Sequence, residues 1–198
     1  MAAPAIALAQ GEHARRAATE LLVLAGDARR LAAEDTKDLH RKGLADRILG
    51  GLSGLDLMLR LADQERGRHP RSHGQALAAL REALTAGDLV RFQSLAADLI
   101  AAYPFRGTGI LRATRTAERL ERGRKLHEEL CAGCHDAPDL AVERPAYNLF
   151  EEVKRLSPGE FAARMSVGVR GDRVTGIDNP LSDEQIASLI AYYRSGAN

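Results

Sequence analysis

The sequence predicts an all-α protein in two parts, an N-terminal helical bundle over residues 11–105 and a smaller helical domain over residues 106–198. Apolar residues recur at spacings of three and four along most of the chain, which is the period of a helix. Aromatic residues make up only 4% of the chain and tryptophan is absent, so the core must consist mainly of alanine and leucine. No segment shows the alternation typical of a convincing strand.

Four amphipathic segments predict a four-helix bundle-like domain, and they cover residues 12–34, 37–63, 75–86 and 89–103. Their short connections favour antiparallel packing. Arg29 and Arg30 are expected on the solvent side of the first helix. The lone histidines are expected to be solvated rather than to bind metal, and they are His40, His69 and His73. We expect the bundle to serve docking or homo-oligomerisation.

Helix-breaking residues separate the two parts, and residues 104–115 are predicted to be a linker. Beyond it, helices are expected to begin at Thr116, near Asn148, after Ser157 and after Ser182. Each of the two serines is followed three residues later by Glu or Gln, the pattern of a capping box. The helix after Ser157 contains Met165.

One pentapeptide carries the chemistry, Cys131-Ala132-Gly133-Cys134-His135. C-x-x-C-H is the attachment motif of a c-type haem, in which both thiols bond the porphyrin and the histidine ligates the iron. C-x-x-C alone could also belong to a zinc site or a redox-active dithiol. The chain has no other cysteine, its remaining histidines are scattered, and no βαβ pattern surrounds the motif. The sequence therefore favours one covalent haem c as the cofactor.

Charge and hydropathy exclude several classes of partner. The net charge is +1, from 28 basic and 27 acidic residues, so nothing indicates a nucleic-acid partner. No stretch is long and apolar enough to predict a transmembrane segment. Residues 1–9 end in a small-x-small pattern and are interpreted as the remnant of a signal peptide. Together with the haem motif, this predicts an exported, periplasmic protein.

Residues 116–194 resemble the small monohaem c-type cytochromes of class I. The resemblance rests on Gly123, the motif at 131–135, Pro145-Ala146-Tyr147, Leu181-Ser182-Asp183-Glu184 and Ala191-Tyr192-Tyr193-Arg194. It implies a class I cytochrome c-like fold in which Gly123 packs against Tyr192 or Tyr193 where the first and last helices cross. It also implies a haem anchored by Cys131 and Cys134, with His135 as proximal ligand and Tyr147 in the cofactor-binding wall.

The sequence departs from this family at the sixth iron ligand. The family usually places a methionine in the loop before the last helix, where this chain has Gly176 and Ile177. Met165 is the distal ligand we infer instead, although a methionine at such a position can also simply fill the core. His127 is interpreted as packing near the haem. Met58 or a histidine of the bundle remains an alternative ligand.

These observations predict an electron carrier rather than an enzyme, working with a redox protein partner. The alternative is a haem with an open sixth position that binds or turns over NO, CO, O₂, peroxide or a sulfur species. Arg170, Arg173 and Asp178 are the candidates for a distal acid–base group in that case. A third alternative is a subunit whose bundle assembles with a larger redox enzyme.

Overall fold

The protein is all-α, as predicted, in a computed structural model that describes residues 10–112, 114–170, 176–177 and 179–196. The expectation of no strand is wrong for one short ladder: β1 (Val169–Arg170) pairs antiparallel with β2 (Gly176–Ile177). The predicted signal remnant, residues 1–9, lies outside the described residues. Among the helices that the structure describes, none combines the length and apolar character needed to cross a membrane.

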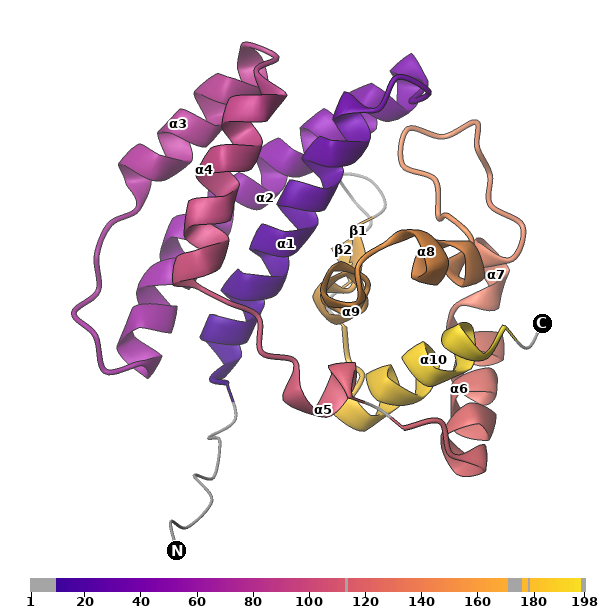
Figure 1. Cartoon of the computed structure of the whole chain (residues 1–198). Coiled ribbons are helices and arrows are strands. Elements are labelled where there is room, and N and C mark those ends of the chain that lie inside the picture. The colour runs from indigo at the N-terminus through magenta and orange to yellow at the C-terminus, as the bar shows by residue number, and fades with distance from the viewer. Residues whose placement is uncertain (1–9, 113, 171–175, 178, 197–198) are drawn as a thin grey trace, which may run out of the picture.

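The N-terminal helices form a four-helix arrangement around one core (Figure 1). They are α1 (Glu12–Ala32), α2 (Asp38–Glu65), α3 (Gly74–Thr85) and α4 (Leu89–Ala102). α1 packs against α2 and α4, and α3 packs against the same two helices. The apolar face of α2 is buried, with Ile48, Leu52, Leu55 and Leu59 fully inaccessible.

The remaining helices surround a second core (Figure 1). They are α5 (Thr108–Leu111), α6 (Ala117–Leu130), α7 (Ala132–His135), α8 (Leu149–Arg155), α9 (Pro158–Val167) and α10 (Asp183–Ser195). The predicted linker is wrong in one respect, because it contains α5 and buries Ile110 in this core. Gly107 has a φ of 47° and turns the chain into α5, so the apolar pair Ile110-Leu111 can reach the core.

Gly123 lets α6 and α10 approach closely. A Cβ atom at this position would overlap the backbone carbonyl of Ser188 and lie 2.7 Å from Cβ of Tyr192. The predicted contact between Gly123 and Tyr192 is therefore confirmed. The crossing places the C-terminal end of α6, where the cysteine motif begins, beside the aromatic residues of α10.

Replacing Gly123 with alanine should lower the free energy of unfolding by about 1–3 kcal/mol, the usual cost of overpacking a core. Gly50 offers a matched control, since a Cβ atom there meets nothing within 4 Å. Gly50→Ala should stabilise the protein by about 0.5–1 kcal/mol, because alanine is favoured in a helix interior. Chemical denaturation of the two variants measures both effects, and equal shifts would contradict the close approach.

The two parts of the chain pack directly on each other. α1 lies against α9, where Val23, Ala163 and Val167 form a small buried cluster. A Cβ atom at Gly43 of α2 would overlap the backbone carbonyl of Glu143. The division near residue 105 stays a prediction, but the second part of the chain is covered by α1 and α2.

Two of the three bundle histidines that were expected to be solvated are not. His73 is half-buried, and its Nε2 lies 2.9 Å from the hydroxyl of Tyr103, which donates to the buried carboxylate of Asp63. His40 is buried because the loop after α7 folds over the start of α2, where His40 Nε2 contacts the Leu140 carbonyl at 3.1 Å. The prediction of a solvated side chain is confirmed for His69 and wrong for His40 and His73.

Candidate functional site

Both cysteines lie on a single turn that follows α6. Cys131 ends this helix, and its N–H donates to the His127 carbonyl at 2.9 Å. The chain continues at once into α7, where the N–H groups of Cys134 and His135 both donate to the Cys131 carbonyl. Cys131 is half-buried, Cys134 is exposed, and both thiols are free. One compact turn therefore carries the two thiols and the histidine of the motif.

His135 is oriented by a backbone carbonyl. Its Nδ1 lies 2.6 Å from the carbonyl oxygen of Tyr147. Because a carbonyl only accepts, Nδ1 must carry the ring proton, which leaves the lone pair on Nε2. A histidine that ligates a metal characteristically has its other nitrogen held in this way. Tyr147, predicted as a cofactor-binding residue, thus contributes its backbone to the site as well as its ring.

The Cys131 thiol is not activated as a nucleophile. Burial raises its pKa, and the hydrogen bond with Tyr193 offsets only part of this effect. A redox-active dithiol needs the opposite direction, a lowered thiol pKa. Within the site, this electrostatic setting disfavours thioredoxin-like chemistry.

A cavity of about 440 Å³ opens beside the motif. Its volume lies within the usual range of ligand and cofactor sites, which are mostly apolar. Cys131, His135 and Tyr147 line it together with Met165. Further apolar side chains complete the wall: Val23, Leu44, Leu130, Leu149, Leu156, Phe161 and Leu181. The structure thus brings four of the five predicted site residues to one cavity, and the fifth, Cys134, lies on the adjoining turn.

Met165 occupies the last turns of α9 and is half-buried at the cavity. The side-chain amide of Asn179 donates to its backbone carbonyl and so ties the end of α9 to the segment before α10. Met165 thus lines the cavity. Its role as the distal iron ligand stays a prediction.

The other candidates around the distal side are placed only in part. Arg173 and Asp178 lie outside the part of the chain that the structure describes, and only the backbone of Arg170 is described. His127 is 3% exposed and packs edge-on against Phe150 and Tyr193. Its two ring nitrogens contact the Tyr193 hydroxyl and the Asp136 carboxylate. The predicted packing role of His127 agrees with these contacts, which leave neither ring nitrogen to ligate an iron.

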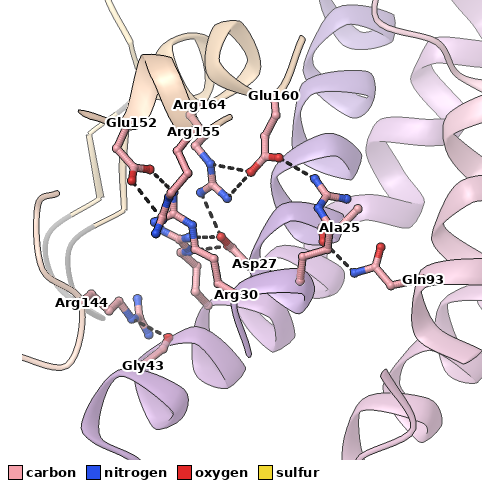
Figure 2. Close-up of polar contacts among 12 residues, drawn as sticks. Ala25, Asp27, Arg30, Gly43, Gln93, Arg144, Glu152, Arg155, Glu160 and Arg164 are labelled. Atoms are coloured by element: carbon pink, nitrogen blue, oxygen red, sulfur yellow. Dashed lines mark hydrogen bonds and ion pairs between the residues drawn. The ribbon is translucent and has the colours of Figure 1, made fainter. Parts of the chain in front are cut away.

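A charged cluster between the two parts of the chain was not predicted (Figure 2). Asp27 of α1 is fully buried and binds Arg47 of α2 and Arg164 of α9. Glu160 binds Arg29 and Arg164, and Glu152 binds Arg30 and Arg155. One signal could have indicated the cluster, because Asp27 interrupts an otherwise apolar stripe between Leu24 and Ala28.

Arg30 corrects one expectation directly. It was expected on the solvent side of its helix, but its side chain is only 13% exposed and pairs with Glu152 of α8. Its guanidinium carbon lies 4.8 Å from the centroid of the Tyr147 ring, so it reaches the wall of the cavity. The helical period alone placed it toward water, whereas α8 and the 136–147 segment cover that face.

The donor set fits a covalently bound haem. Two free thiols on one turn can form the thioether bonds, and the hydrogen bond of His135 Nδ1 to the Tyr147 carbonyl selects the tautomer that ligates through Nε2, in a largely apolar cavity. Comparisons with models of known families, with curated proteins and with solved structures found no significant match.

Proposed function

We propose that this protein is a periplasmic c-type cytochrome that carries one haem and transfers electrons between redox partners. Cys131 and Cys134 would anchor the haem, with His135 as the proximal ligand. The hydrogen bond from His135 Nδ1 to the Tyr147 carbonyl carries the proposal, because it leaves Nε2 free beside two thiols and an apolar cavity. The resemblance of residues 116–194 to class I cytochromes is consistent with these roles.

The chain's own residues provide what electron transfer requires. A bound haem supplies an iron that cycles between the ferrous and ferric states. The largely apolar wall would limit the contact of a bound haem with water, and the packing of α6 against α10 positions the motif. Cys134 is exposed and Leu130, beside the motif, is 61% exposed, so this edge is accessible to a protein partner. A net charge of +1 favours a partner recognised by local apolar contact.

Visible spectra with and without CO test the function together with the sixth ligand. The matured protein should be low-spin and indifferent to CO in its reduced form. Met165→Ala should become high-spin and bind CO, because the replacement removes the methionine sulfur from the cavity.

Met58→Ala is the matched control for this experiment. Met58 packs against the core of the bundle rather than the cavity, so its loss should leave the spectrum unchanged. Immediate CO binding by the unmodified protein would refute Met165 ligation and favour small-ligand chemistry instead. Failure of the matured protein to show any haem spectrum would refute the proposed function itself.

A further inference from the structure

The N-terminal helices form part of the cavity wall. α1 contributes Val23 and Arg30, and α2 contributes His40, Leu44 and Arg47. The 136–147 segment is bound to α2 by two contacts, from Arg144 Nε to the Gly43 carbonyl at 3.1 Å and between His40 Nε2 and the Leu140 carbonyl. A cofactor in this cavity would therefore touch both parts of the chain.

This shared wall carries an excess of positive charge. Among the described residues, four guanidinium groups line the cavity, those of Arg30, Arg47, Arg144 and Arg164. The Nε of Arg144 donates to a backbone carbonyl, that of Gly43. Two acidic residues of the described part of the chain line the same cavity, Glu143, which pairs with Lys42, and Glu152. Such a wall suits an anionic group.

Arg30 has unused hydrogen-bonding capacity at this wall. Its Nε atom is buried and has no hydrogen-bond partner among the described residues. Burial lowers the pKa of Arg30, and the charge of Arg164 lowers it further, while Glu152 opposes both. Burying a hydrogen-bond donor without an acceptor is unfavourable. An anion in the cavity would provide the missing acceptor.

We propose that Arg30, together with Arg47 and Arg144, binds the propionate carboxylates of the haem. The inference rests on the proposed function and extends it, because it gives the N-terminal helices a direct role in holding the cofactor. Arg–carboxylate pairs are strong, and bidentate geometry makes them specific. The haem would then join the two parts of the chain, with thioether bonds on one side and guanidinium groups on the other.

The midpoint potential of the holoprotein, measured as a function of pH, tests this inference. Removing a cation within about 4–6 Å of a carboxylate should raise the carboxylate's pKa by about 1–3 units. The Arg30→Gln and Arg144→Gln variants should therefore show a one-proton pH dependence of the potential between about pH 5 and 7, where the unmodified protein is flat. Spectra across the same range should titrate in parallel.

Arg29→Gln is the matched control, because the Arg29 side chain is 55% exposed and does not line the cavity. After this substitution Glu160 is still paired with Arg164. His40 and Glu143 also line the cavity, and both are unchanged in every variant, so they cannot account for a difference between variants. Arg30→Gln leaves the Glu152 carboxylate paired with Arg155 alone, which could destabilise the fold. The double variant Arg30→Gln/Glu152→Gln removes that carboxylate as well and so controls for this destabilisation. It should keep the new pH dependence.

The outcomes separate the inference from the proposed function. A matured protein without covalent haem would refute both. A haem-loaded protein in which Arg30→Gln, the double variant and Arg144→Gln all give potentials as flat as Arg29→Gln would refute propionate binding alone. If the midpoint potentials of the cavity variants depend on pH and that of Arg29→Gln does not, the N-terminal helices hold the propionates.

Discussion

Asp27→Asn should lower the free energy of unfolding by about 3–5 kcal/mol, the usual effect of removing one partner from a buried ion pair. Asp27 is fully buried and binds Arg47 through Nε at 2.6 Å and Arg164 through Nη1 at 2.9 Å. Asparagine has nearly the same shape but no charge. It would leave Arg47 without its carboxylate and Arg164 with Glu160 alone, although both guanidinium groups are mostly buried.

Glu82→Gln provides the control, because Glu82 pairs with Arg91 on the surface of the bundle and its side chain is 68% exposed. An exposed pair of this kind contributes about 0–1 kcal/mol. Urea denaturation followed by circular dichroism compares the two variants under the same conditions. If Asp27→Asn is no less stable than Glu82→Gln, the cluster between α1, α2 and α9 does not hold the two parts together.

Local signals predicted most of the helices correctly. The cap at Ser182 forms the expected capping box with Gln185, and Ser157 accepts from the Glu160 N–H. These interactions span three residues, so they can be recognised in the sequence without knowledge of the fold. The two thiols and His135 can also be predicted from the sequence, because they belong to one contiguous motif.

Contacts between distant segments could not be predicted in the same way. Periodicity describes one helix at a time and so predicts a solvent-facing Arg30, and a lone histidine such as His40 is predicted to be solvated in the same local way. Their burial depends on α8 and on the 136–147 segment, more than 95 residues further along the chain. The hydrogen bond between His135 and Tyr147 likewise depends on the path of a loop. The part of the site contributed by α1 and α2 therefore becomes visible only in the folded chain.

The largest effect on function should come from the double variant Cys131→Ser/Cys134→Ser, which should contain no covalently bound haem. Each thioether forms when a thiol adds across a vinyl double bond: sulfur bonds one carbon, and the proton goes to the other. A serine hydroxyl is nearly the same size but is a much weaker nucleophile. The variant should therefore fold with a similar cavity and lose the bond to the cofactor.

Haem staining after denaturing electrophoresis distinguishes the two kinds of attachment, because thioether bonds survive unfolding whereas the bond from His135 to iron does not. The single variant Cys134→Ser should retain stain through Cys131, and Ala132→Ser, which changes the motif at a position without a thiol, should behave like the unmodified protein. Retention of covalent haem by the double variant would show that the cysteines are not the anchors. Such a result would assign the covalent anchor to other residues, while the His135–Tyr147 hydrogen bond would still orient Nε2 as an iron ligand, because that contact does not involve either thiol.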